Sequence, residues 1–141
     1  MTVQRSEQDA YHELSAYTLG HGGPAFIHQH AVDAFAAQRA GEGTKPIGLT
    51  FALVGLYLHL ERGFSGRQVQ RVHMQMGGRK RQWPQFVLPA QRGSVTPVDV
   101  MAAPEGAERD KAIDDWCRSV WEAYAANRGA VVDLLRHYGI E

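Results

Sequence analysis

The sequence predicts an all-α protein: a compact bundle of five to six helices in one domain spanning residues 1–141. Apolar residues recur at three- and four-residue spacing in several segments, which is the periodicity of helices with a buried face. Clusters of glycine and proline separate these segments, as they commonly do at helix ends. No segment alternates like a strand, and 141 residues are enough to bury one hydrophobic core.

The first two predicted helices flank a glycine-rich break. Residues 7–19 form the first helix, and Ser6 is its expected N-cap. The run Gly-His-Gly-Gly-Pro at 20–24 ends it, with the proline well placed to begin a new helix. The second helix covers about residues 25–39, and we expect Ile27, His28 and Phe35 on its apolar face.

The next two predicted helices form the middle of the chain. Pro46 opens the third, whose residues 49–60 are apolar on all sides. A helix without a polar face belongs in the centre of a bundle. A turn at 63–66 leads into the fourth helix, about residues 66–76, which two glycines end.

The last part of the chain begins with a long proline-containing loop at about 82–106. Within it, Thr96-Pro97-Val98-Asp99 is typical of one capped helical turn. A final helical region begins near Ala107, and we expect Trp116, Trp121 and Tyr124 to be core aromatic residues. Gly129 is the expected point at which a last helical segment separates.

Composition narrows the classes of partner. Fifteen basic and fifteen acidic side chains cancel, which argues against nucleic acid and anionic membranes as partners. The longest apolar run, 47–60, is shorter than the roughly 20 residues of a membrane span. Cys117 is the single cysteine, so no intrachain disulfide forms. With no apolar leader at the polar N-terminus, these features indicate a cytoplasmic protein.

Seven histidines are the main functional signal, because imidazole suits metal binding and proton transfer near neutral pH. If the second, third and fourth helices are antiparallel neighbours, one end of the bundle collects four of them. The expected metal ligands are His21, His28, His59 and His73, with Gly55 opposite His73 leaving room for a cavity. The nearby carboxylates of Asp33 and Glu61 are expected to orient them.

The spacing of the histidines along the sequence excludes other kinds of metal site. His28 and His30 are two residues apart, so on a helix they diverge by roughly 200°, and we expect His30 to point elsewhere. No histidine pair has the spacing of a zincin helix, and no cysteine pair exists. The expected cofactor is therefore a divalent transition metal, zinc or iron, held by imidazole and carboxylate. The alternative is that these histidines are buried and hydrogen-bonded for structural reasons alone.

Basic residues suggest a different site. Arg67 and Arg71 share one face of the fourth helix, and Arg79, Lys80 and Arg81 follow with Trp83. Such a group would suit an anion or a phosphate backbone. The zero net charge favours the simpler interpretation of a solvated helix face.

The segment from Ala25 to Gln38, read Ala-Phe-Ile-His-Gln-His-Ala-Val-Asp-Ala-Phe-Ala-Ala-Gln, resembles the signature of a bacterial family of unknown function. On this resemblance, His28, Asp33 and Gln38 match the motif positions, and the similarity extends over most of the chain. Longer members begin with Cys-x-x-Cys-Gly and a further Cys before the His, which looks like a zinc site. This chain lacks that segment, so the resemblance implies a fold and a motif but no reaction.

Three hypotheses follow. The leading one is a small helical protein that binds a metal ion or small ligand through histidines at one end of the bundle. If it is an enzyme, a metal with an open position would activate water or a substrate oxygen. The second is a structural or interaction module, forming a homodimer, with structural histidines. The third is an anion or nucleic-acid binder that uses Arg67, Arg71 and Arg79 to Arg81.

Overall fold

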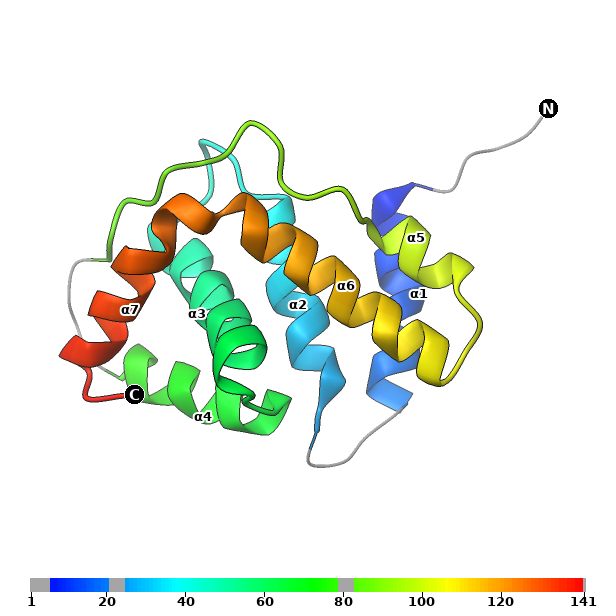
Figure 1. The fold of residues 1–141 in the computed structure, drawn as a ribbon, viewed down its shortest axis with the longest axis horizontal. Coiled ribbons are helices and arrows are strands. Elements are labelled where there is room, and N and C mark those ends of the chain that lie inside the picture. Colours follow the sequence, from blue (N-terminus) through cyan, green and yellow to red (C-terminus); the bar gives the residue numbers. More distant parts are fainter. Residues whose placement is uncertain (1–5, 21–24, 79–82, 141) are drawn as a thin grey trace.

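The structure is a computed structural model that describes residues 6–20, 25–78 and 83–140, and it confirms the all-α fold. Within these ranges the chain forms seven α-helices, one 3₁₀ turn and no strand (Figure 1). They are α1 (Glu7–Gly20), α2 (Ile27–Gln38), α3 (Pro46–Arg62), α4 (Gly66–Gly77), α5 (Pro97–Ala102), α6 (Ala107–Ala123), η1 (Ala125–Asn127) and α7 (Arg128–His137). The count exceeds five or six because the capped turn and the last segment are separate helices.

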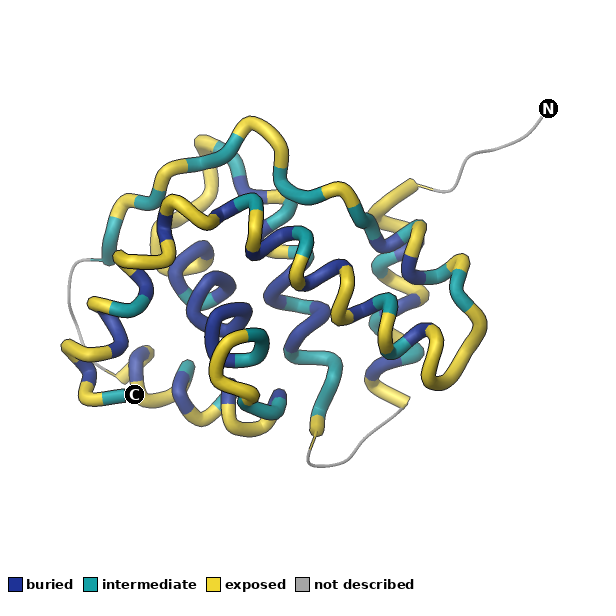
Figure 2. Tube along the Cα trace, in the orientation of Figure 1, coloured by how far each residue is buried: buried dark blue, intermediate teal, exposed yellow. Residues whose placement is uncertain are grey.

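Helix α3 lies at the centre of the fold, as its apolar sequence predicts. Every residue from 52 to 58 is buried, and α2, α4, α6 and α7 all pack against it (Figure 2). Proline in the first turn starts the helix, and Gly63 ends it with a φ of 69°. None of the helices in the described part of the chain is long and apolar enough to span a membrane.

Two helix starts carry the caps that their sequences predict. The Ser6 hydroxyl accepts a hydrogen bond from the Asp9 amide at 3.0 Å, so Ser6 caps α1 as expected. At α5, the Asp99 carboxylate accepts from the Thr96 amide at 2.9 Å, which completes a capping box.

Helix α2 buries its small residues and leaves its larger ones half-exposed. Ala31, Ala34 and Ala37 are fully buried, while Val32 and Phe35 are only partly covered. The small side chains let α3 come close. The space beside Gly55, where we expected room for a metal cavity next to His73, is filled instead by the Asp33 carboxyl group.

The segment 83–96 runs extended over α2 and α6 (Figure 1), as the proline pattern predicts. The Gln38 amide donates to the carbonyls of Arg92 and Val95 at 3.2 and 2.8 Å. The Asn127 side chain forms two hydrogen bonds with the Val87 backbone, at 2.7 and 2.8 Å. These amide side chains hold the segment in place because they satisfy backbone groups that have no helix to pair with.

Helix α6 is joined to α2 by polar contacts within the core. Trp116 Nε1 donates to the Gln38 side chain at 2.9 Å, and the Tyr124 hydroxyl donates to the Ala37 carbonyl at 2.6 Å. Both aromatic residues are fully buried, as is most of Trp121, which confirms the prediction of core aromatics. The helix ends at Ala123, before the expected break at Gly129, which lies inside α7.

Candidate functional site

A pocket of 320 Å³ opens where the start of α2, the end of α3 and the first half of α6 meet. It brings together two histidines and two aspartates from three separate parts of the chain. We call it the imidazole pocket; its lining residues are Ala25, Ile27, His30, His59, Gly63, Phe64, Ser65, Asp110 and Asp114.

The two imidazole rings of the pocket are stacked. The ring centroids of His30 and His59 are 3.5 Å apart, and the planes differ by 14°. His59 Nε2 lies 2.9 Å from Asp114 Oδ1, and its Nδ1 lies 3.3 Å from the Phe64 carbonyl oxygen. Both of these partners are acceptors. His59 therefore lies within hydrogen-bonding distance of two acceptors, which fixes the orientation of its ring.

His30, the second ring of the stack, is buried and uncharged. Only 4% of the residue is exposed, and burial, reinforced by the nearby charge of His59, lowers its pKa to about 3. The ring is therefore neutral at physiological pH. Its Nδ1 atom is buried and has no hydrogen-bond partner among the residues that the structure describes. A buried polar atom left unpaired in this way costs about 1–3 kcal/mol.

Two carboxylates of α6 complete the polar lining. The hydrogen bond from His59 is the main reason that the pKa of Asp114 is lowered, so this carboxylate stays ionised. Asp110 Oδ1 accepts a hydrogen bond from the Tyr17 hydroxyl at 3.0 Å. That hydroxyl in turn accepts from the Gly106 amide at 3.1 Å. Asp110 is therefore positioned by α1 and by the turn before α6.

The backbone is strained beside the pocket. Phe26, between two lining residues, has φ 41° and ψ 61°, a left-handed conformation that costs a bulky residue about 1–3 kcal/mol. The start of α4 fixes it there. The Gly66 amide donates to the Ala25 carbonyl at 2.6 Å, and the Arg67 guanidinium lies 4.1 Å from the Phe26 ring centroid. Strain of this kind clusters at ligand sites, which favours this pocket as the functional one.

The histidines expected to converge have separate partners. His28 Nδ1 lies 2.9 Å from the Thr18 hydroxyl, which itself donates to a carbonyl, so the histidine donates and joins α2 to α1. His73 Nε2 donates to the Phe51 carbonyl at 2.8 Å, and its ring stacks on that of Phe51. Burial lowers the pKa of both histidines. His21 lies outside the described residues.

His28, His59 and His73 therefore do not share a cavity, contrary to the expectation from sequence. His73 faces Phe51, which precedes His59 by eight residues or about 12 Å along α3. Among the described residues, no three His, Cys, Asp or Glu side chains form a group arranged to hold a metal ion. The His30–His59 stack contributes to this, because nitrogen lone pairs lie in the ring planes and two parallel rings do not aim at one ion.

The carboxylates expected to orient the histidines also have other partners. Asp33 is buried and accepts from the Gln29 amide at 3.0 Å, and its second oxygen has no hydrogen-bond partner among the described residues. Burial raises its pKa well above the usual range, which favours the neutral carboxylic acid. Glu61 accepts from Arg128 at 2.8 Å and from Trp121 at 2.7 Å, and the Arg128 contact chiefly lowers its pKa.

The two predicted anion-binding arginines of α4 are both exposed. Arg67 donates to the Gln70 side chain at 3.1 Å and lies over Phe26. Arg79, Lys80 and Arg81 fall outside the described residues.

Sequence reasoning missed His30, Asp110 and Asp114. The signal for His30 was its seven-residue spacing to Ala37, which puts both on the buried face of α2. Asp110 and Asp114 are four residues apart and so share a face of α6. Neither spacing was recognised as a sign of a buried face, because a buried face is usually predicted from large apolar residues, and these positions carry small or acidic ones.

Comparison with known proteins identifies the family. Residues 4–125 match the sequence model of DUF5946, described as a family of unknown function. The chain belongs to this family. The resemblance seen in the sequence to a family of unknown function is thereby confirmed. No curated protein and no solved structure matches the chain.

The three motif positions expected for this DUF5946 chain each join α2 to a different neighbour. His28 contacts α1 through Thr18, and Asp33 fills the space beside Gly55 of α3. Gln38 contacts the 83–96 segment and Trp116 of α6. In this chain, the three residues therefore connect α2 to the elements packed around it.

Proposed function

We propose that this protein binds a compact organic cation, an amine or guanidine with a short apolar part, in the imidazole pocket. The observation that carries the proposal is the buried, neutral His30 beside the His59–Asp114 contact, because His30 Nδ1 has no hydrogen-bond partner among the described residues. His30 lines the pocket, and the strained Phe26 lies between two of its lining residues. Strained backbone clusters at ligand sites, which supports this pocket as the binding site.

The charge of the pocket selects the ligand class. The pocket is lined by the ionised Asp114 and by Asp110, against a single basic partner of Asp114, the His59 ring, while His30 stays neutral. The polar side therefore carries an excess of negative charge, which attracts a cation. Ile27 and Phe64 line the same pocket and suit a short hydrocarbon group.

Titration with butylammonium tests the proposal, with butyrate as the anion of similar size. We expect saturable binding of butylammonium, measured by calorimetry, and weaker binding or none for butyrate. Asp114→Asn removes the carboxylate charge and should weaken butylammonium binding at least about tenfold, since hydrogen bonds to charged groups contribute about 1.5–3 kcal/mol.

The adjacent residue provides the control. Asp115→Asn changes the same charge on α6, but Asp115 pairs with Lys111 at 3.0 Å and does not line the pocket. The Asp115→Asn variant should bind butylammonium with the wild-type affinity. Equal binding of the two probes, or equal losses in the two variants, would overturn the proposal and favour the structural-module hypothesis.

A divalent metal ion is the second candidate ligand, because two imidazoles and two carboxylates line one pocket. Binding would require the His30–His59 stack to open so that the ring nitrogens point to one ion. Zinc chloride, titrated alone into the chelator-treated protein, tests this. Stoichiometric binding that His30→Gln abolishes and His12→Gln retains would support it, since His12 is exposed on α1. Equal losses in both variants would contradict it.

A further inference from the structure

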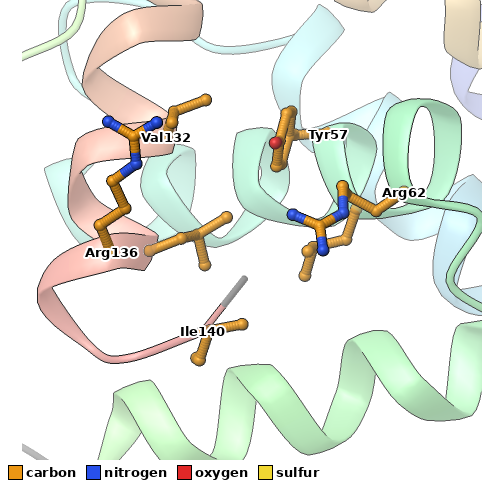
Figure 3. A pocket seen from close by; sticks show the side chains of 7 residues that line it. Tyr57, Arg62, Val132, Arg136 and Ile140 are labelled. Carbon is orange, nitrogen blue, oxygen red and sulfur yellow. The ribbon is translucent and has the colours of Figure 1, made fainter.

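We propose a second binding site, for a small organic anion, in the cavity between α3, α7 and Ile140. This cavity has a volume of 280 Å³ and is separate from the imidazole pocket. Two arginines from distant parts of the sequence, Arg62 and Arg136, lie on opposite sides of it with Tyr57 between them (Figure 3).

The guanidinium groups of both arginines lie beside the same cavity (Figure 3). Arg62 belongs to the last turn of α3 and Arg136 to the last turn of α7, so the packing of these helices brings the charges together. Guanidinium groups bind carboxylate and phosphate oxygens through paired, charge-assisted hydrogen bonds. An anion between the two would therefore receive donors from both sides.

Neither charge is strongly neutralised by the described residues. No ion pair of Arg62 occurs among them, and Arg136 is paired only with the exposed Asp133, at 4.0 Å. Arg128 provides a contrast within the same region. It lies over the Tyr57 ring, but it is held by Glu61 at 2.7 Å and so is already compensated. Among the described residues, neither Arg62 nor Arg136 has a contact as close as the one between Arg128 and Glu61.

The remaining lining defines the rest of the ligand. Val132, Leu135 and Ile140 also line the cavity and contribute apolar side chains. A carboxylate or phosphate with a short hydrocarbon chain fits this combination, since its charge meets the arginines and its chain meets the apolar wall. A purely structural role for the arginines, complementing the partial negative charge at two helix ends, predicts no such ligand.

Hexanoate titrated into the full chain tests the site, with hexanamide as its uncharged analogue and inorganic phosphate as the anion without a chain. We expect saturable shifts of the Val132 and Ile140 amide resonances with hexanoate, weaker ones with phosphate and none with hexanamide. Arg62→Gln and Arg136→Gln should each weaken hexanoate binding at least about tenfold. Both residues are exposed, so the variants should fold.

Arg118→Gln is the matched control, because Arg118 is an exposed arginine of α6 outside this cavity. It should bind hexanoate as the wild type does. Three outcomes would overturn the proposal: no saturation at millimolar hexanoate, an equal loss in all three variants, or a loss of thermal stability in the Arg62 and Arg136 variants with unchanged binding. The last result would assign the arginines to helix-end stabilisation.

Discussion

The Asp33 carboxyl group is enclosed between α2 and α3, and it makes Gly55 indispensable at the position opposite. A Cβ atom at residue 55 would lie 2.6 Å from Asp33 Cγ and closer still to its oxygen. The Asp33 side chain has little freedom to move, because it is buried and accepts a hydrogen bond from Gln29. The close approach of the two central helices therefore depends on this pair.

Gly55→Ala should lower the free energy of unfolding by about 1–3 kcal/mol. Overpacking a core contact has a cost of that size, which exceeds the gain of about 1 kcal/mol from alanine's helix propensity. Urea unfolding followed by circular dichroism measures the change.

Gly48→Ala on the same helix is the control, since a Cβ at residue 48 meets no atom within 4 Å. It should leave stability unchanged or raise it by up to about 1 kcal/mol. Adding Asp33→Ala to Gly55→Ala should recover part of the loss by making space. An equal effect of the two glycine substitutions would show that the Asp33 contact is not limiting.

At the residue scale, the sequence correctly predicted that His28 and His30 point in different directions. It predicted that His28 lies near His59 of α3, whereas in the structure His30 does. Their divergence on a helix followed from spacing alone. Which of them faces α3 depends on the neighbours of α2, and α1, α3, α4 and α6 all pack on it. The larger residues Val32 and Phe35 suggested one buried face, while Ala34 and Ala37 form the more deeply buried one.

At the scale of elements, Gln38 connects three parts of the structure. Its side-chain nitrogen donates to two carbonyls of the 83–96 segment, and its oxygen accepts from Trp116 of α6. The extended segment has no internal helix or strand to satisfy its backbone. We infer that its position over α2 and α6 depends largely on such side-chain amides.

Gln38→Leu should destabilise the protein by about 2–4 kcal/mol, because each buried polar group left unpaired costs about 1–3 kcal/mol. Hydrogen exchange should rise in peptides from residues 83–96 while residues 52–58 of α3 stay protected. Mass spectrometry of the exchanged peptides measures both.

Gln85→Leu makes the same chemical change at an exposed residue of that segment and should leave exchange unaltered. If Gln38→Leu changed exchange uniformly across the chain, or left residues 83–96 as protected as before, the role assigned to Gln38 would be wrong.

At the scale of the whole molecule, the local sequence pattern predicted the helices and the central position of α3. Helix periodicity, helix caps and glycine breaks depend only on residues that are close in sequence. The local pattern did not predict the imidazole pocket. That pocket joins residues 25–30, 59–65 and 110–114, and their meeting depends on how α6 crosses α2 and α3. The break between α6 and α7 also came earlier than Gly129 suggested, at Tyr124, whose hydroxyl is bound to Ala37 of α2.

Folding of the whole chain is also what keeps His30 neutral. An unfolded histidine takes up its proton near pH 6.5, whereas burial lowers the pKa of the folded His30 to about 3. The unfolded state therefore binds more protons between these values, so this residue favours folding above pH 6.5 and that contribution is lost as pH falls. Acid should weaken the fold across this window.

The imidazole pocket depends most on His30, a neutral, buried imidazole stacked on the ring of His59. Nuclear magnetic resonance of the histidine ring nitrogens, recorded through a pH titration of the folded protein, tests this most directly. We expect the His30 ring to stay neutral down to at least pH 5, and to titrate near its ordinary value of about 6.5 once the chain is unfolded in urea. A folded His30 that takes up its proton near pH 6.5 would contradict the account.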